Sequence, residues 1–276
     1  MLISPFTPIF FINRKTDGIR SPYTQVFASS DQILVQMLCG PLEEVGEWKL
    51  FSEPGHILLD YVDFSVWNMN SYMDVLFAVL SPSPGLYSLE IAGTTSEVFR
   101  VTDDPIVLQN TTLIQYSMKD NRQRTDGVFF IDGMQRFFDF RVPGGFKDSN
   151  WSFAVDGEQF ITPSADIVQL YGLDSIQKKF TLGNSEGCPV WFAELLNRLL
   201  CCDYVYFDGE RYARKDTSVP ETTVLLEGIN SFVFTQNLQR VINIDPFLTM
   251  QHQALIRRIN NIEYRLATTN INRIIK

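Results

Sequence analysis

The sequence predicts a mostly-β fold with two β-sandwich or barrel-like regions, one short helix inserted into the second region, and a long C-terminal helix. Short alternating runs separated by turn residues extend through about the first 240 residues, and this pattern is typical of antiparallel strands. Aromatic residues make up 13% of the chain, with 22 Phe among them, and such side chains suit a pleated, half-buried surface. From Asp245 onward the apolar spacing becomes helical.

The composition argues against several classes of protein. Hydrophobic residues make up 45% of the 276 residues and charged residues only 20%, which favours folded cores over disorder. The net charge of −9 makes the body repel phosphate backbones, so we expect no nucleic acid partner for it. No run of 18 apolar residues occurs, so we expect no membrane span.

The N-terminal segment is apolar but does not resemble a signal peptide. Residues 1–12 contain no basic residue, and Pro5 and Pro8 interrupt the segment. The protein is therefore expected to be made in a cytoplasm, where cysteines stay reduced. Buried structural thiols are favoured over metal or redox sites for the four cysteines, which are Cys39, Cys188, Cys201 and Cys202.

Residues 1–105 are expected to form the first β domain. Turn residues such as Glu53-Pro54-Gly55 separate its apolar runs. The predicted strands are 33–38, 56–61, 75–80, 86–91 and 98–101. The polar stretch 102–105 ends in proline and marks the predicted domain boundary.

Residues 106–244 are expected to form the second β domain. Strands are predicted at 111–118, 136–142, 222–226 and 232–235. A charged loop is predicted at 119–126, and Pro143-Gly144-Gly145 is predicted to turn the chain after its second strand. Asp208-Gly209 lies between two short aromatic runs and predicts a hairpin with a type I′ turn.

One helix is predicted inside the second domain, at 189–202. Pro189 suits a first helical turn, where its missing N–H would have no partner. The apolar stripe that should pack on a sheet consists of Phe192, Leu195, Leu196, Leu199 and Leu200.

Residues 245–276 are predicted to form a C-terminal interaction helix. Asp245 suits the N-cap and Pro246 the first helical position. From Phe247 onward the chain carries five cations and one anion, which leaves a net −13 on the preceding residues. Heptad spacing favours docking on another subunit, while a helix folded back on its own domain stays open. The expected subunit-interaction residues are Leu248, Leu255, Ile259, Ile262 and Leu266, flanked by Arg257, Arg258 and Arg265.

No motif points to catalysis, a cofactor or a metal. The two histidines, His56 and His252, lie far apart in the sequence, and neither belongs to a set of residues with zinc-ligand spacing. Phosphate-binding loops, dinucleotide fingerprints and nucleophile elbows are also missing. Acidic pairs that a hydrolase could use remain a minor alternative, at Asp60/Asp63, Asp103/Asp104 and Glu43/Glu44.

The second region resembles a known group of proteins. The similarity lies in Phe180–Gly183, Gly187–Trp191, Leu196–Leu199 and Tyr206–Tyr212, with further likeness in 113–117 and 136–146. These segments resemble tail- and baseplate-type structural proteins of tailed phages and prophages of gut bacteria. The resemblance covers roughly residues 106–245, and it implies a virion component without catalytic residues.

The function expected from the sequence is therefore that of a structural phage virion subunit, plausibly of the tail or baseplate. Its expected partners are copies of itself and other virion proteins. The alternative is a carbohydrate-binding or adhesin-like module, for which Trp67, Trp151 and Trp191 could supply aromatic surfaces.

Overall fold

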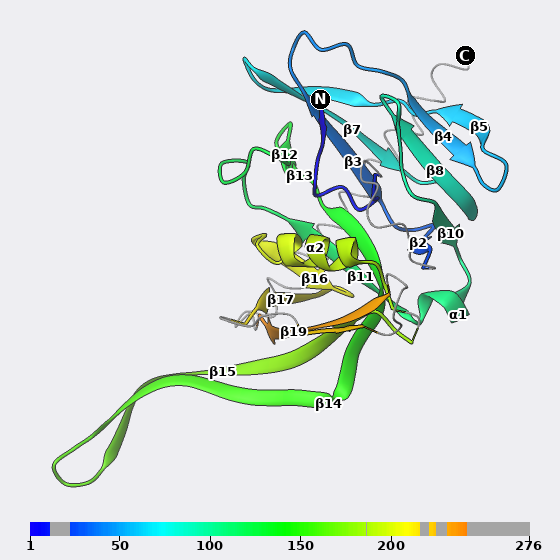
Figure 1. Ribbon diagram of the computed structural model, residues 1–276. Coiled ribbons are helices and arrows are strands. Elements are labelled where there is room, and N and C mark those ends of the chain that lie inside the picture. Colours follow the sequence, from blue (N-terminus) through cyan, green and yellow to red (C-terminus); the bar gives the residue numbers. More distant parts are fainter. Residues whose placement is uncertain (12–22, 186, 216–220, 225–230, 242–276) are drawn as a thin grey trace, which may run out of the picture. The chain divides into compact units, whose positions relative to one another are not determined.

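Antiparallel strands make up most of the part of the chain that the computed structural model describes, which is residues 1–11, 23–185, 187–215, 221–224 and 231–241. Residues 1–240 form one compact unit, shown in Figure 1, and residues 241–276 form a second one that, Val241 apart, lies outside the described residues. The described strands are β1 (Leu2–Ile3), β2 (Gln25–Ala28), β3 (Ile33–Cys39), β4 (Trp48–Ser52), β5 (Ile57–Tyr61), β6 (Ser65–Asn70), β7 (Met73–Leu80), β8 (Gly85–Ile91), β9 (Thr94–Thr95), β10 (Phe99–Thr102), β11 (Thr111–Ser117), β12 (Phe130–Ile131), β13 (Met134–Gln135), β14 (Phe138–Ile161), β15 (Ile167–Leu182), β16 (Tyr204–Phe207), β17 (Glu210–Arg214), β18 (Glu221–Val224) and β19 (Phe232–Arg240). The described helices are α1 (Pro105–Leu108) and α2 (Val190–Leu199).

Two sheets, here called the sheet pair, form the N-terminal region. One has the strand order β1-β3-β7-β6, and the other has the order β2-β10-β8-β4-β5 with β9 paired to β8. Alternate side chains of both sheets meet in one core, to which β3 contributes Val35, β7 Leu76, β4 Trp48 and β8 Leu89. The sheet pair therefore has its own hydrophobic core.

Six strands of the second region close into a ring, here called the barrel. β11 pairs with β14 and β16, and β17 joins β16 to β19. β15 pairs with both β14 and β19, which completes the circle, and β18 adds to β19 outside it. Closing the ring pairs both edges of each of these strands where they run together.

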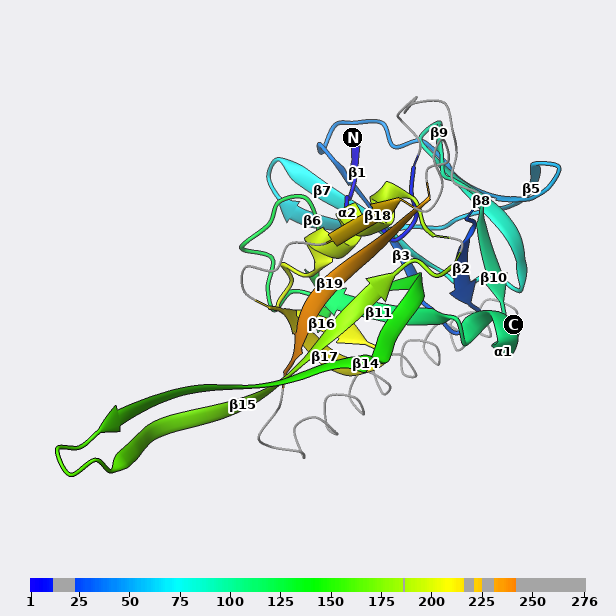
Figure 2. The same ribbon diagram turned by 60° about the horizontal axis from the view of Figure 1, so that its bottom comes forward.

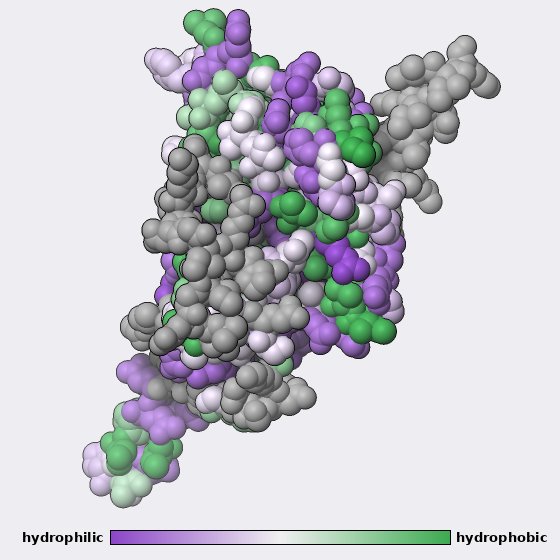
Figure 3. Space-filling model, turned by 45° about the vertical axis from the view of Figure 1, so that its right-hand side comes forward, coloured by the Kyte–Doolittle hydropathy of each residue, from purple (hydrophilic) through white to green (hydrophobic). Residues whose placement is uncertain are grey.

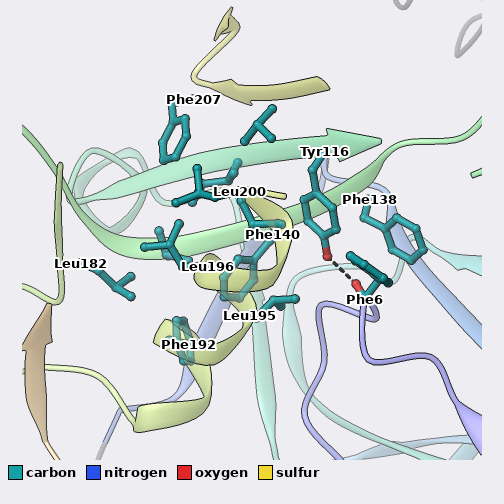
Figure 4. Packing of buried hydrophobic residues seen from close by; sticks show 14 of the residues in the cluster. Phe6, Tyr116, Phe138, Phe140, Leu182, Phe192, Leu195, Leu196, Leu200 and Phe207 are labelled. Carbon is teal, nitrogen blue, oxygen red and sulfur yellow. Dashed lines mark hydrogen bonds between the residues drawn. The ribbon is translucent and has the colours of Figure 1, made fainter. Parts of the chain in front are cut away.

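Aromatic and aliphatic side chains fill the interior of the barrel (Figure 4). On β14, Phe138, Phe140 and Val142 alternate inward, as the period of a strand requires. The Tyr116 hydroxyl on β11 donates a hydrogen bond to the carbonyl oxygen of Phe6, drawn as a dashed line in Figure 4. A residue from the chain's beginning thus belongs to the core of the second region.

Helix α2 confirms the predicted inserted helix. Pro189 is its N-cap residue, with extended backbone angles. The buried face of α2 joins the barrel core through Phe192, Leu195, Leu196 and Leu199. Spacings of three and four residues put these side chains on one face of the helix.

The sheet pair and the barrel region are in direct contact through β3. This strand is buried along its whole length, so that Val35 faces the core of the sheet pair while Leu34 belongs to the barrel core. The next residue of β3, Gln36, also joins the two regions: its side-chain amide donates to the Val128 carbonyl oxygen at 2.7 Å and accepts from the Val128 N–H at 3.1 Å. The single polar residue in the apolar run of β3 therefore pairs both backbone groups of one loop residue.

Ionic contacts join the same two regions near the start of β14. The Arg141 guanidinium donates to both carboxylate oxygens of Asp31, at 2.7 and 2.8 Å. Asp139, two residues earlier on β14, accepts from the Gln32 N–H at 2.8 Å and from the Gln115 amide at 2.9 Å. These carboxylates lie where the β2–β3 connection meets the barrel wall.

The predicted fold class needs one correction. Strands dominate as expected, but the described residues contain only two short helices, α1 and α2, and the predicted long C-terminal helix is not among these described elements. The eight predicted subunit-interaction residues, from Leu248 to Leu266, lie outside the described residues. An isolated stretch of about three heptads is only marginally stable as a helix in water, so the heptad spacing by itself was weak support for the predicted element.

The predicted turn at Pro143-Gly144-Gly145 is wrong. β14 continues through these residues, and Gly144 and Gly145 pair with Leu182 and Thr181 of β15. Gly144 adopts a φ of +114°, so the glycine serves a distortion within the strand rather than a reversal.

The domain boundary predicted at 102–105 stays a prediction. Helix α1 begins at Pro105, the last residue of this stretch, and the Asp104 carboxylate caps the helix by accepting from the Ile106 N–H. The sheet pair and the barrel consist of separate sheets. Phe6 and Leu34, however, come from the N-terminal region and belong to the barrel core.

Candidate functional site

The distinctive surface of the described chain is a two-stranded arm that β14 and β15 form beyond the barrel (Figures 1 and 2). β11 pairs with β14 only as far as Pro143, and β19 pairs with β15 only from Gln177 onward. From Phe153↔Ile176 to Ile161↔Ile167, β14 and β15 pair only with each other. At about 3.4 Å per residue, residues 153–161 span roughly 30 Å.

An irregularity in the strand pairing separates the arm from the barrel. Phe146 pairs with Phe180, but the next pair is Trp151 with Lys178, so β14 uses extra residues at this point. Such bulges bend a strand and increase its twist. The arm therefore begins at a defined distortion.

Aromatic packing anchors the base of the arm. The Phe146 ring stacks on Tyr212 with a centroid separation of 4.7 Å, and it meets the edge of Phe180 at 5.2 Å. The Lys178 ammonium lies 5.4 Å from the centroid of the same Phe146 ring. Because these contacts come from three barrel strands, they fix the point from which the arm departs.

A hydrogen-bonded turn, residues 162–166, closes the far end of the arm. The Thr162 N–H donates to the Asp166 carbonyl oxygen at 2.9 Å, and the Ala165 N–H donates to the Thr162 carbonyl oxygen at 2.9 Å. The Thr162 hydroxyl oxygen also accepts from the Asp166 N–H at 3.1 Å. Thr162 thus orders the turn from both its backbone and its side chain.

Apolar side chains cover both faces of the arm next to this turn, and together they are here called the tip. Ile161 and Ile167 are cross-strand partners and therefore share one face, where they are 71% and 63% exposed. Phe160 pairs with Val168 on the opposite face and is 47% exposed. Leu170, an extra residue in the β15 pairing next to Gln169, adds a further apolar side chain that is 58% exposed.

The arm beyond its base is acidic. Residues 152–176 contain four Asp or Glu residues and no Lys, Arg or His. Glu158, Asp166 and Asp174 are exposed among them, whereas Lys178 and Lys179 lie at the base. Figure 3 shows hydrophobic surface in green at the end of the arm, next to hydrophilic surface in purple.

A two-stranded hairpin that extends into solvent without packing against other elements is unusual in a folded protein. Two-stranded hairpins are marginally stable in water, and exposed strand edges invite pairing with another chain. The tip adds exposed side chains of the kind that interfaces bury. The arm is therefore the strongest candidate for a contact surface among the described residues.

The arm is not among the elements predicted from the sequence. Its strands contain Gly157 and Gly172, which are cross-strand partners. Glycine weakens a strand pattern, and Pro143-Gly144-Gly145 gave a strong local turn signal before it. One feature of the sequence could have indicated the arm: a long stretch without basic residues on either side of the turn-forming residues Thr-Pro-Ser, 162–164.

The other residues considered for chemistry are scattered among the described residues. Cys39 and Cys188 are buried, Cys202 is half-buried and Cys201 is exposed, so the expectation of buried thiols holds only in part. Burial raises the pKa of the Cys188 and Cys202 thiols to about 12, which keeps both protonated near neutrality. No three His, Cys, Asp or Glu side chains gather as a metal site within the described ranges.

The tryptophans proposed for sugar binding are packed where they are described. Trp67 is partly buried against the small cluster that includes Val75. Trp191 stacks on Phe10 with ring centroids 5.1 Å apart. For Trp151 the structure describes the strand but not the surroundings of the side chain.

None of the described helices is long and apolar enough to span a membrane. Comparisons of the chain with protein-family models, with curated proteins and with solved structures find no match.

Proposed function

We propose that this protein is a non-enzymatic structural subunit of a phage virion, of the tail or baseplate, that assembles through protein–protein contacts. Its partners would be copies of itself and other virion proteins, and its location the particle. The resemblance of residues 106–245 to tail- and baseplate-type proteins motivates the particle, while the arm supports the mode of action.

The observation that carries the proposal is the division of the second region into a filled barrel and a bare arm. The barrel interior is occupied by buried aromatic side chains, among them Phe138, Phe140 and Phe180. Such an interior supports a rigid scaffold rather than a binding cavity. The arm, by contrast, exposes Ile161 and Ile167 to water, which a neighbouring protein would cover.

Particle fractionation tests this function. Phage particles produced by a strain that carries this chain would be purified on a density gradient and analysed by mass spectrometry and immunogold labelling. The chain should co-sediment with the particles at a fixed ratio to the other structural proteins. Recovery of the chain only in the soluble fraction would overturn the proposal.

A variant without the arm's outer part sharpens this test. Phe153 and Ile176 are cross-strand partners, so residues 154–175 can be replaced by Asn-Gly, which favours a tight hairpin turn. The shortened protein should fold, because the removed strands pair only with each other, but it should be lost from particles. The matched control is Ile57→Ser with Leu59→Ser on β5, which removes exposed apolar surface elsewhere and should leave incorporation unchanged.

A further inference from the structure

We infer that the tip of the arm inserts into a socket on a different protein, one that is apolar inside and basic around its rim. This inference rests on the proposed function, since it names the chemistry of the partner that the arm would engage. Two independent observations carry it: the distribution of apolar side chains over the tip and the sign of the charges behind it.

The apolar side chains define the shape of the partner. Ile161 and Ile167 lie on one face of the hairpin, while Phe160 and its cross-strand partner Val168 lie on the other. A flat partner surface would cover one face and leave the other in water. A cleft with two walls covers both, so the register of the hairpin points to a socket.

The charges define the rim. Glu158 is two residues behind Phe160 on β14, Asp174 lies farther back on β15, and Asp166 belongs to the turn. With no cation in residues 152–176, this surface attracts Lys and Arg side chains and repels anions. Charge complementarity therefore requires a basic rim.

The same charges argue against other occupants. Anionic lipid surfaces and nucleic acid would be repelled by the acidic arm. The sheet pair of a second copy is a poor match as well, because residues 1–105 carry 13 Asp and Glu against 5 Lys and Arg, a net −8. A different protein with a basic surface is the occupant that the observations favour.

The turn holds the tip ready for insertion. Thr162 makes five hydrogen bonds within residues 162–166, so the two faces are held in register before any partner binds. An ordered hairpin loses little conformational freedom on docking, which favours binding.

Photo-crosslinking from both faces of the tip tests the inference. The photoreactive amino acid p-benzoylphenylalanine would replace Phe160 in one full-length variant and Ile167 in another, in cells that produce particles. Both probes should crosslink to the same protein, at peptides rich in Lys or Arg. The control probe replaces Tyr72, which is exposed on the β6–β7 turn and should not reach that protein.

A charge variant tests the rim separately. Glu158→Gln with Asp174→Asn should lower the crosslinking yield from Phe160 by about tenfold at low salt, because electrostatic steering is lost. The control removes two exposed acids elsewhere, Glu44→Gln with Asp60→Asn, and should leave the yield unchanged.

Several outcomes would overturn the inference. A crosslink from one face only would replace the socket by a flat contact, and crosslinks to the chain's own peptides or to lipid would identify another occupant. Equal yields in the two charge variants would refute the basic rim. Particles that contain the chain without any crosslink from the tip would refute this inference and leave the proposed function intact, whereas crosslinks in cells whose particles lack the chain would do the reverse.

Discussion

Asp139 shows how one buried carboxylate is held by the meeting of three chain segments. It lies on β14 and is 5% exposed, while its hydrogen-bond donors come from Gln32 of the β2–β3 connection and Gln115 of β11. Burial raises the pKa of the Asp139 carboxyl from 3.8 to about 6, although the two donors and Arg141 oppose the rise. Protonation of Asp139 in the folded state therefore occurs at a higher pH than in the unfolded chain.

This raised pKa predicts a pH-dependent stability. The folded protein binds the proton more tightly, so the stabilisation is fully present below about pH 3.8 and is lost as the pH rises through about 6. Asp139→Asn removes the titration and keeps the shape, provided that the Gln115 amide turns over. The free energy of unfolding of the native protein minus that of the variant should fall by about 1.4 kcal/mol between pH 5 and pH 8.

Urea denaturation at both pH values measures this difference. Asp132→Asn, at an exposed acid in the β12–β13 turn, is measured alongside as the control substitution. A difference for Asp139→Asn that does not change with pH would contradict the assignment.

At the scale of single elements, the sequence predicted those strands, turns and helices that depend on neighbouring residues. The hairpin at Asp208-Gly209 is confirmed, with φ of +47° and +84°, as a type I′ turn requires. Strands β3 and β7 lie where apolar runs between turn residues predict them, β8 and β11 lie where alternation predicts them, and α2 follows its apolar stripe. Each of these elements carries its own signal within about ten residues.

The arm and the closure of the barrel could not be predicted in the same way. Their cause is pairing between distant residues, as in Gly144 with Leu182 and Gln177 with Gln239. Such pairing overrides a local turn signal when both strands gain partners. The candidate site was missed for the same reason, because the residues that share each of its two faces can be identified only from the register of β14 and β15.

Gly144 and Gly145 offer a matched pair for testing this point. At Gly144 the φ is +114°, and an added Cβ would lie 2.1 Å from the Thr181 carbonyl oxygen. At Gly145 an added Cβ would meet only the Thr112 hydroxyl oxygen, at 3.4 Å. Gly144→Ala should therefore lower the free energy of unfolding by about 3 kcal/mol or more, through backbone strain and overpacking.

The control, Gly145→Ala, should change stability by less than about 1 kcal/mol. Chemical denaturation compares the two variants directly. Equal losses would show that the distortion at Gly144 does not constrain the strand.

At the scale of the whole described unit, the stability of the folded protein depends on the contacts between the sheet pair and the barrel. These comprise the apolar contacts of Leu34 and Phe6, the amide pair of Gln36 with Val128, and the ion pair of Arg141 with Asp31. In the ion pair, the side chains are 12% and 1% exposed. Removing one partner would leave a largely buried charge without its counterion.

Asp31→Asn should therefore destabilise the folded protein by about 3 kcal/mol. Asp126→Asn is the matched control, because Arg124 also donates to both oxygens of Asp126 but the two side chains are about 30% exposed. The control should cost no more than about 1 kcal/mol. Thermal or urea unfolding of both variants measures the difference, and comparable losses would mean that burial adds nothing at the joint.

The place of Phe6 in the barrel core also has a consequence for biosynthesis. The ring packs against Phe129 and Phe138, and the neighbouring Pro5 carbonyl oxygen accepts a hydrogen bond from the Arg198 guanidinium at 2.9 Å. A ribosome adds roughly 5–20 residues per second, so roughly 10–40 s pass between the synthesis of Pro5 and that of Arg198. During that interval the nascent chain has no finished barrel core to receive Phe6. Phe6 is thus synthesised well before the strands that bury it, and its ring stays exposed to water until those strands have been made.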